Sequence, residues 1–495
     1  RRILRCMDNA AANDQRVLER ARISRDPRFD GRFYVGVLTT GIYCRPICPA
    51  NAPKSENVRF FPTAAAAGEA GFRPCLRCRP ECAPGTPAWA GTSTTVRRGL
   101  RLIADGVLSE GDVEVLAARL GVTSRHLRRL FVRHVGASPL AVAHTQRLHL
   151  AKRLIDETTM SMKDISVAAG FGSVRRFNDT FRRVYGRPPR DLRRSGDAAR
   201  GPGSFSLMLP YRKPYDWNRL LGFYELRAIP GVEQVVDGRY RRSIRYGDGH
   251  GVIEVYDAGD ALCLSVCGLR AESLLALVQR VRGMFDVDAP IDEIGPALRR
   301  DAQLRAWLME NPGVRVPGAW DGWELAVRAV LGQQVSVAAA TTFAGRIAER
   351  YGDTVAVDGR GDGPSRLFPV PRSLARARLE HLGIIRSRAQ TIRDLARATV
   401  RGDVSFDASQ TPQEFRDAFT AIRGIGDWTA EYVAMRAFKD PDAFPASDLG
   451  LLRAFDASSG RRLRPRELHE RAESWRPWRA YAALLTWGSD VGAGG

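Results

Sequence analysis

The stretch IRGIGDWTAEYVAMRAFKDPDAFPASDLGLLR, residues 422–453, decides the fold of the larger part of this 495-residue chain. It predicts a helix that enters a tight turn at Gly424 and Gly426, and a second helix that starts at Asp427. The two glycines allow the backbone to turn sharply and leave N–H groups exposed. Exposed N–H groups at the start of a helix bind phosphate without help from side chains, so the turn predicts a phosphate site, for which a Gly-x-Gly turn by itself is weak evidence.

Downstream of the turn, Pro445 and Asp448 complete a wider pattern. Helix, glycine hairpin, helix, Gly/Pro-rich loop and Asp together resemble the signature of the helix-hairpin-helix DNA glycosylases of base excision. The resemblance is closer still to the AlkA family, the bacterial 3-methyladenine DNA glycosylases II, across residues 205–490. The stretches that carry it are PYDWNRLLGFYELRA, RAVLGQQVSVAAA and WRPWRAYAALLTW. It implies a β-rich subdomain over 205–290, a helical body over 291–495, and an active-site cleft beside the hairpin.

Asp448, in FPASDLGL, corresponds to the catalytic Asp of this family. Departure of a positively charged alkylated base leaves an oxocarbenium-like sugar, which a nearby carboxylate stabilises. The same carboxylate is also placed to orient the attacking water. An Asp after a proline loop alternatively serves as the N-cap of a helix, and Asp448 is able to do both.

Three aromatic residues, Trp428, Tyr432 and Trp487, match the family residues that line the base pocket. An enzyme that acts on a base must first take it out of the stack, and aromatic faces favour cationic alkyl-purines. The alternative for these residues is ordinary core packing. Trp428 also occupies the position that carries Lys in strand-cleaving relatives. No Schiff base with the sugar is therefore expected, and the enzyme is predicted to be monofunctional.

Gln334, in GQQVS, stands where the well-known enzyme of the family has an apolar wedge that fills the gap left by the flipped base. Gln is longer and polar, so it is able to hydrogen-bond the orphan base, and it is expected to hold the bent duplex less well. No cysteine follows Cys267, which argues against the iron–sulfur cluster of some relatives.

The positive charge of the chain is concentrated in its first part. Residues 1–200 hold 36 Lys and Arg against 18 Asp and Glu, whereas residues 201–495 hold 40 against 37. A basic first part favours a polyanionic partner, most simply nucleic acid. No apolar run is long enough for a membrane span, and we expect that no signal peptide precedes the first motif. We therefore expect a cytoplasmic, nucleoid-associated bacterial protein without membrane contact.

Four cysteines in two close pairs lie in this basic part: Cys44 and Cys48 in TTGIYCRPIC, and Cys75 and Cys78 in RPCLRC. Without a secretory signal disulfides are disfavoured, and the spacing fits tetrahedral thiolate ligation of one zinc ion. The simplest interpretation is a closed structural site that is inert once formed. Cys82 is a fifth nearby thiol, interpreted as a bystander that alternatively exchanges as a ligand.

The sequence around these cysteines, from DQRVLERARISRDPRFDGRFYVGVLTTGIYCRPICPA to ENVRFFPTAAAAGEAGFRPCLRCRPE, resembles the N-terminal domain of the Ada family over residues 6–82. In that family the zinc is structural, and one ligand is also a sacrificial nucleophile that takes a methyl group from a methylated DNA phosphate. The matching residue is Cys44, and zinc would keep its sulfur in the reactive thiolate form. Arginines near the cysteines are expected to hold the flanking phosphates; they are Arg45, Arg73, Arg77 and Arg79.

Residues 113–139 and 162–189 repeat one plan, a short helix, a tight turn and a second helix. Gly121 breaks the first unit, and Ser173 caps the second helix of the other. The pair resembles the two helix-turn-helix units of AraC-type activators, joined by a helix near 139–156; the same module follows the zinc domain in Ada. The first side chains of a recognition helix enter the major groove, and here they are Ser124, Arg125, His126, Arg128, Ser173, Arg175, Arg176 and Asn178. The alternative is a helical spacer with a solvated Arg face.

The chain is too long for one core, so we expect a multidomain protein, mainly α with α+β parts. The expected parts are an Ada-like zinc domain (1–90), an AraC-like double helix-turn-helix domain (92–194), a flexible linker SGDAARGPGS (195–204) and an AlkA-like glycosylase (205–495).

The expected function is DNA alkylation repair with an adaptive response. A monofunctional glycosylase would hydrolyse the N-glycosidic bond of alkylated purines such as 3-methyladenine, and a zinc-bound cysteine would irreversibly accept methyl from DNA phosphotriesters and promote transcription activation. The expected partners are alkylated and promoter double-stranded DNA and RNA polymerase, with the chain as a monomer. One alternative is a zinc-dependent transcriptional regulator with a weak or inactive glycosylase domain. Another is a zinc-stabilised DNA-binding protein without methyl transfer.

Overall fold

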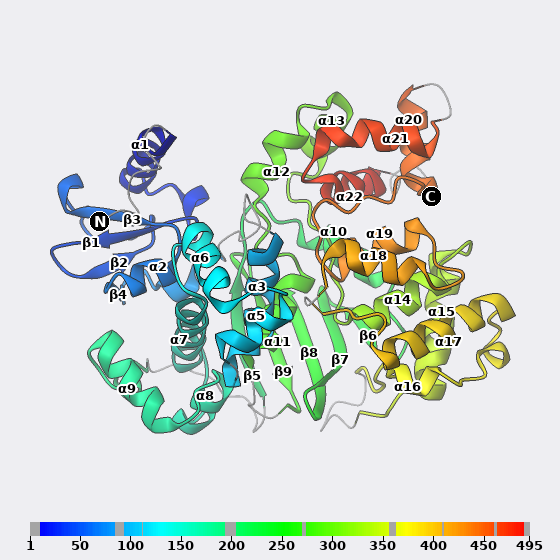
Figure 1. Cartoon of the computed structure of the whole chain (residues 1–495), viewed down its shortest axis with the longest axis horizontal. Helices are drawn as coiled ribbons and strands as arrows, with labels where there is room; N and C mark the ends of the chain where they lie inside the picture. The colour runs from blue at the N-terminus through cyan, green and yellow to red at the C-terminus, as the bar shows by residue number, and fades with distance from the viewer. Residues whose placement is uncertain are drawn as a thin grey trace. The chain divides into compact units, whose positions relative to one another are not determined.

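The computed structural model of the chain describes residues 10–84, 94–110, 112–193, 204–269, 274–355, 363–407, 410–459 and 463–489. The predicted linker, 195–204, lies outside these residues except for Ser204. The chain forms two compact units, one of residues 1–199 and 271–279 and the other of residues 200–270 and 280–495. Each unit combines one sheet with a larger set of helices (Figure 1), which confirms the expected multidomain class. None of the described helices is long and apolar enough to cross a membrane.

The first unit begins with a four-stranded sheet of order β3-β1-β2-β4. Its elements are α1 (Ala10–Ile23), η1 (Pro27–Phe29), β1 (Tyr34–Val37), β2 (Ile42–Cys44), η2 (Ser55–Asn57), β3 (Val58–Phe61), α2 (Ala64–Glu69), β4 (Arg73–Pro74) and η3 (Pro80–Cys82), where η marks a 3-10 helix. Strands β2 and β4 pair in parallel with Tyr43 opposite Pro74. Cys44 and Cys75, which follow these two residues, therefore lie at the same end of the strand pair.

The rest of the first unit is helical. Its elements are α3 (Thr94–Ala104), α4 (Val107–Glu110), α5 (Val113–Arg119), α6 (Ser124–Val135), α7 (Pro139–Glu157), α8 (Met162–Ala168), α9 (Val174–Tyr185) and η4 (Pro189–Leu192). The pairs α5–α6 and α8–α9 form the two predicted helix-turn-helix units, and α7 joins them. Thr123 and Ser173 cap α6 and α9 by accepting backbone N–H bonds, and Gly121 takes φ +69 in the first turn. These features confirm the predicted turns and caps.

The four-cysteine segment packs against α7, so two parts that the sequence separates share one compact unit. Ser138 Oγ donates to Glu69 Oε1 at 2.7 Å. Thr63 Oγ1 donates to Val135 O at 3.1 Å. The domain boundary near residue 90 stays a prediction. The described residues before and after it belong to the same compact unit.

The second unit starts with a five-stranded antiparallel sheet of order β5-β9-β8-β7-β6. Its strands are β5 (Ser204–Pro210), β6 (Glu233–Val236), β7 (Arg239–Tyr246), β8 (Gly249–Asp257) and β9 (Ala261–Cys267), and α10 (Trp217–Glu225) packs on β6 and β7. Asp237 and Gly238 both have positive φ in the two-residue turn between β6 and β7, which suits the twist of a hairpin. Cys263 and Cys267 lie in β9, as their alternating sequence predicts.

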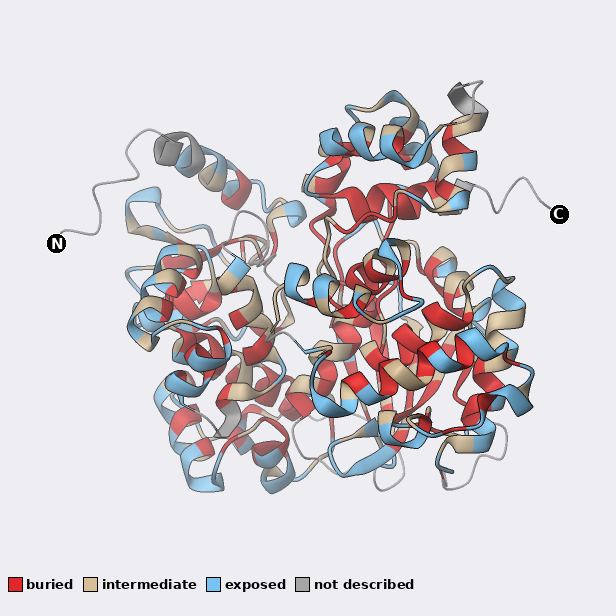
Figure 2. Cartoon of the chain, turned by 45° about the vertical axis from the view of Figure 1, so that its right-hand side comes forward, coloured by how far each residue is buried: buried red, intermediate tan, exposed pale blue. Residues whose placement is uncertain are grey.

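Helices make up the rest of the second unit. Helix α11 (Leu274–Met284) is divided between the two units, because residues 271–279 belong to the first. The helices after it are α12 (Ile291–Leu298), α13 (Ala302–Glu310), α14 (Gly322–Leu331), α15 (Val337–Tyr351), α16 (Pro371–Leu374), η5 (Leu379–Leu382), α17 (Arg386–Arg401), α18 (Pro412–Thr420), α19 (Asp427–Arg436), α20 (Leu449–Ser459), α21 (Pro465–Ala472), η6 (Glu473–Trp475) and α22 (Arg479–Ser489). Helix α19 packs against α18 and α14, and α14 also packs against α17. Buried residues gather on the inner faces of the helices and on the sheet (Figure 2).

The hairpin between α18 and α19 depends on a glycine at position 424. Gly424 has φ +92, and a Cβ there would lie 2.3 Å from Thr391 Oγ1. Gly424→Ala is therefore expected to lower the free energy of unfolding by about 1–3 kcal/mol, measured by denaturant titration. The matched control is Gly426→Ala, because Gly426 has φ −105 and no atom within 4 Å of a new Cβ. Equal losses in the two variants would contradict the strain assigned to Gly424.

Candidate functional sites: the four-cysteine centre and the Asp448 cluster

The four predicted metal ligands meet in one place. The sulfur atoms of Cys44, Cys48, Cys75 and Cys78 all lie within 4.8 Å of one another. Four thiolates around a tetrahedral zinc ion, at about 2.3 Å each, stand roughly 3.8 Å apart, so the cluster has a suitable size. A donor set made only of sulfur also selects a soft, tetrahedral metal such as zinc.

Backbone N–H groups donate hydrogen bonds to sulfur atoms of the centre. One donates to Cys78 Sγ at 3.3 Å, and others hydrogen-bond the sulfurs of Cys48 and Cys75. A hydrogen bond stabilises the charge on a thiolate and makes it less available to an electrophile. That Cys44 is the reactive one of the four sulfurs stays a prediction.

The arginines near the centre fall into two groups. Arg45 is largely buried against Asp30, to which its Nε donates at 2.8 Å, and Arg79 lies 2.7 Å from Asp156. Arg73 and Arg77 are exposed. A phosphate would have to compete with Asp30 for Arg45. The ion pair therefore disfavours the DNA contact predicted for Arg45, which stays a prediction. The exposed pair fits that role better.

A balanced set of charges joins the four-cysteine segment to α7. Its members are Arg79 and Glu81 from the segment, and Lys152, Arg153, Asp156 and Glu157 from α7. Lys152 Nζ lies 2.6 Å from Asp156 and 3.8 Å from Glu81. Burial raises the pKa of the nearby Cys82 to about 11, so this thiol stays protonated, which favours its interpretation as a bystander.

The predicted DNA-reading residues lie on the surface. Arg125 and Arg128 are exposed on α6, and Arg175 and Arg176 are exposed on α9. Arg128 lies 3.6 Å from Glu114 and Arg175 lies 4.0 Å from Asp179. Solvent-exposed pairs of this kind contribute little, so both guanidiniums can exchange their carboxylate for a phosphate or a base edge.

The Asp448 carboxylate is held by three donors. Its Oδ2 accepts from Trp428 Nε1 at 2.7 Å, and its Oδ1 accepts from Trp487 Nε1 at 2.9 Å. Oδ1 also accepts from the backbone N–H of Leu451 at 3.0 Å, in the first turn of α20. Asp448 thus performs the capping role, while the two indoles fix its orientation beside the aromatic residues.

The predicted aromatic residues gather around this carboxylate. Trp428 and Tyr432, four residues apart on α19, stack with ring centroids 5.3 Å apart and an interplanar angle of 8°. Trp487 lies 6.2 Å from Tyr432 at 58°. The structure therefore brings together all four residues that the sequence predicted for catalysis and base binding.

Three residues beside this cluster escaped the sequence analysis: Phe223, Arg227 and Arg436. The Arg227 guanidinium lies 3.8 Å above the Phe223 ring, and that of Arg436 lies 4.8 Å from the same ring and hydrogen-bonds Tyr432 OH. Burial alone would raise the pKa of Tyr432, but the guanidiniums of Arg436, Arg227 and Arg328 outweigh it and lower that pKa. One sequence pattern could have indicated these residues: an aromatic residue is followed four positions later by Arg in both FYELR (residues 223–227) and YVAMR (residues 432–436).

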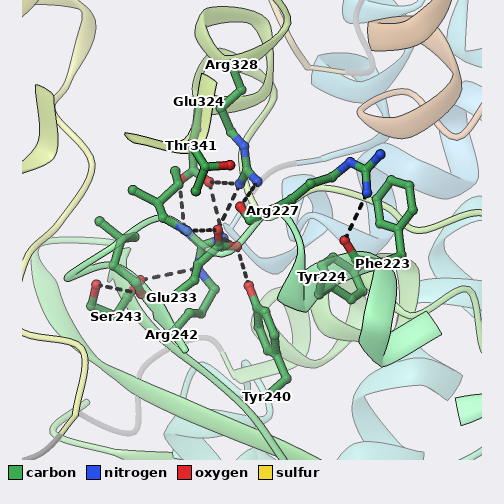
Figure 3. A network of polar contacts seen from close by, with 12 residues as sticks. Phe223, Tyr224, Arg227, Glu233, Tyr240, Arg242, Ser243, Glu324, Arg328 and Thr341 are labelled. Carbon is green, nitrogen blue, oxygen red and sulfur yellow. Dashed lines mark hydrogen bonds and ion pairs between the residues drawn. The ribbon is translucent and has the colours of Figure 1, made fainter. Parts of the chain in front are cut away.

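A buried ionic network attaches α14 to the sheet (Figure 3). Arg328 of α14 lies 2.9 Å from Glu233 of β6, and Glu324 of α14 lies 2.7 Å from Arg242 of β7. Tyr240 donates to Glu233 Oε1 at 2.6 Å. Two acids and two guanidiniums thus neutralise one another in the core, which is the condition for burying charge without a large penalty.

The loops predicted to touch DNA lie next to each other. Gln334 is exposed in the turn between α14 and α15, and Gly424 and Gly426 are exposed in the hairpin. The α19 N-terminus has no side-chain cap, so its first N–H groups are open to an anion. Gln333 connects the two loops by donating Nε2 to Gly424 O at 2.9 Å.

Comparisons with known proteins agree with this arrangement. Four family models match in succession: "Metal binding domain of Ada" (18–81), "Helix-turn-helix domain" (116–195), "AlkA N-terminal domain" (206–321) and "HhH-GPD superfamily base excision DNA repair protein" (327–480). The "Probable bifunctional transcriptional activator/DNA repair enzyme AlkA" of Mycobacterium tuberculosis is 44% identical over 474 residues, 94% of this chain and 95% of its own length. The chain belongs to this bifunctional family. Its four-cysteine centre is the zinc site of the Ada-type segment.

Two further relatives match the second unit. The DNA-3-methyladenine glycosylase 2 of Escherichia coli is 33% identical over 286 residues, 56% of this chain and 95% of its own length. The 3-methyladenine DNA-glycosylase structure from Archaeoglobus fulgidus gives a TM-score of 0.51 at 21% identity, covering 58% of this chain and 98% of that chain. At that identity the structural match shows the fold alone.

The contact of Tyr43 with α7 gives a pH-dependent prediction. Tyr43 OH and His149 Nε2 lie 3.0 Å apart, and burial, aided by Arg153, lowers the pKa of His149 to about 4. The stability that depends on neutral His149 is present above the unfolded pKa near 6.5 and is lost as the pH falls through 4. Hydrogen exchange of α7 peptides should report a loss of up to about 3 kcal/mol over this range. His149→Gln should flatten the dependence; an unchanged profile would contradict this assignment.

Proposed function

We propose that residues 205–495 hydrolyse the N-glycosidic bond of cationic alkylated purines, such as 3-methyladenine, in double-stranded DNA. The observation that carries the proposal is the Asp448 carboxylate, fixed by two indole N–H groups beside a stacked aromatic pair. The printed name of the Escherichia coli relative supports the same substrate class.

The proposed reaction depends on the negative charge of the Asp448 carboxylate, which is held in position before the base is bound. Trp428 and Tyr432 offer aromatic faces to an extruded cationic base. When the glycosidic bond breaks, its electron pair leaves with the base, which becomes neutral, and positive charge develops on the sugar. Asp448 stabilises that charge without reorienting, because its donors already hold it. Water then bonds to the anomeric carbon and releases a proton.

We infer that this enzyme is monofunctional. A strand-cleaving mechanism needs an amine that forms a Schiff base with the sugar. The hairpin position of that amine is Trp428, whose N–H is bound to Asp448. Residues 205–495 contain two lysines; Lys213 pairs with Asp260 at 2.6 Å, and Lys439 lies against Gly283. The lack of cysteine after Cys267 supports an enzyme without an iron–sulfur cluster.

We propose that Cys44 accepts a methyl group from a methyl phosphotriester of DNA. Its Sγ forms a bond to the methyl carbon while the O–CH₃ bond breaks, and the phosphate oxygen keeps the electron pair as an ordinary phosphodiester anion. Bound zinc would supply one thing, the thiolate form of the four sulfurs. Four thiolates with Zn²⁺ carry a net charge of −2, which transfer reduces to −1, so repulsion from DNA falls and affinity rises.

The helix-turn-helix part would use the raised affinity of the methylated protein for DNA to activate transcription. The exposed arginines of α6 and α9 support promoter binding, and we propose RNA polymerase as the further partner and a monomer as the acting form. The alternative of a regulator with a weak or inactive glycosylase is disfavoured, because the complete Asp448 cluster is assembled.

Asp448→Asn tests the glycosylase mechanism. Removing the negative charge while keeping the shape should lower single-turnover release of N-methylated purines by about 10²–10³-fold. Asp417→Asn, an exposed change on α18, is the control and should keep full activity. Full activity of Asp448→Asn would refute its assigned role, and no base release by the wild type would refute the glycosylase itself.

Cys44→Ser tests the methyl acceptor. After incubation with methyl phosphotriester DNA, mass spectrometry should show one added methyl on the wild type, located at Cys44. Cys82→Ser, the matched control, should accept methyl like the wild type, because its thiol stays protonated. Methyl uptake by Cys44→Ser would show that another cysteine is the nucleophile.

A further inference from the structure

Gln334 stands in a turn with a strained backbone. The turn joins α14 to α15, and Gln334 is exposed with φ +56. A residue other than glycine keeps this left-handed conformation only where its surroundings impose it. The groups that impose it belong to the preceding residue, Gln333, and to α17.

Arg388 of α17 holds the peptide that links Gln333 to Gln334. Its guanidinium donates to the carbonyl oxygen of Gln333. This carbonyl lies in the same rigid plane as the N–H of Gln334, so the bond restrains the φ of Gln334. Arg388 is only 8% exposed, so the hydrogen bond is partly shielded from water, which strengthens it as a restraint.

The Gln333 side chain ties the same turn to the hairpin. Its Nε2 donates to Gly424 O at 2.9 Å and to Thr429 Oγ1 at 3.1 Å. Thr429 is buried in α19, and Gly424 is the left-handed glycine of the hairpin. One carboxamide therefore bridges two loops that are 91 residues apart in the sequence.

The helix that holds the first loop also supports the second. Thr391, on the same face of α17 as Arg388, donates Oγ1 to Arg423 O at 3.0 Å. The turn that carries Gln334 and the hairpin thus share Gln333 and one face of α17. These bonds couple the positions of the two loops.

We propose that Gln333, with Arg388, is a positioning residue for base flipping: it keeps Gln334 at a fixed place relative to the phosphate-binding N–H groups of the hairpin. The proposal rests on the proposed glycosylase function and on entry of Gln334 into the duplex. The inserting side chain and the backbone anchor act on the same few nucleotides. If the position of Gln334 relative to the hairpin varies, a smaller fraction of the bound bases is extruded. The affinity for undamaged duplex stays unchanged.

The test compares single-turnover excision by full-length Gln333→Leu with a matched control, Gln413→Leu. Gln413 also donates Nε2, to Asp417 at 2.8 Å, but on an exposed face of α18. Gln333→Leu should excise an N-methylated purine from a fully paired duplex about tenfold more slowly, and the control should match the wild type. Binding of undamaged duplex should stay within about twofold of the wild type in both variants.

A substrate with an abasic site opposite the methylated purine separates positioning from general damage. Extrusion costs less when the base is unpaired, so the defect of Gln333→Leu should shrink to about twofold on this duplex. Equal defects on both duplexes, or no defect on the paired one, would overturn the proposal. If thermal unfolding shows that Gln333→Leu does not fold, Arg388→Met should show the same contrast. Failure of the wild type to release base would refute the proposed function instead.

Discussion

The geometry of the second unit depends on the buried pairing of Glu233 with Arg328 and of Glu324 with Arg242. These side chains attach α14 to β6 and β7, and each charge is neutralised by a direct partner. Helix α14 packs against α19 and α17 and leads into the turn of Gln334. A shift of α14 on the sheet would therefore displace the Trp428–Tyr432 stack and the turn that carries Gln334 at the same time.

Balanced charges also join two parts of the first unit. Arginine, lysine and acidic side chains of η3 and α7 balance one another where the zinc segment meets the helix-turn-helix part. Tyr43, the neighbour of Cys44 on β2, reaches His149 of α7. A chemical change at Cys44 therefore occurs one residue away from a direct contact with the helix that joins the two DNA-reading units.

Local patterns in the sequence were enough to predict much of both sites. Cysteine spacing predicted the zinc centre. The hairpin with its downstream Asp448 carried the resemblance to the glycosylases, and that resemblance supplied Trp428, Tyr432 and Trp487 as the members of the cluster. Resemblance alone chose Cys44, because the spacing of the cysteines does not distinguish one ligand from another. The ion pair of Arg45 with Asp30 and the bridge from Gln333 to Gly424 were not predictable, since they join residues distant in sequence that carry no shared motif.

The most direct test of the account is a double-mutant cycle on the network in the core of the second unit. Glu233→Gln leaves the buried guanidiniums of Arg328 and Arg242 with one carboxylate between them, that of Glu324, so the free energy of unfolding should fall by about 3–5 kcal/mol. Adding Arg328→Met removes both charges, and it should recover most of this loss together with base release. A double variant as unstable as the sum of the two single variants would contradict the view that charge balance holds the site in place.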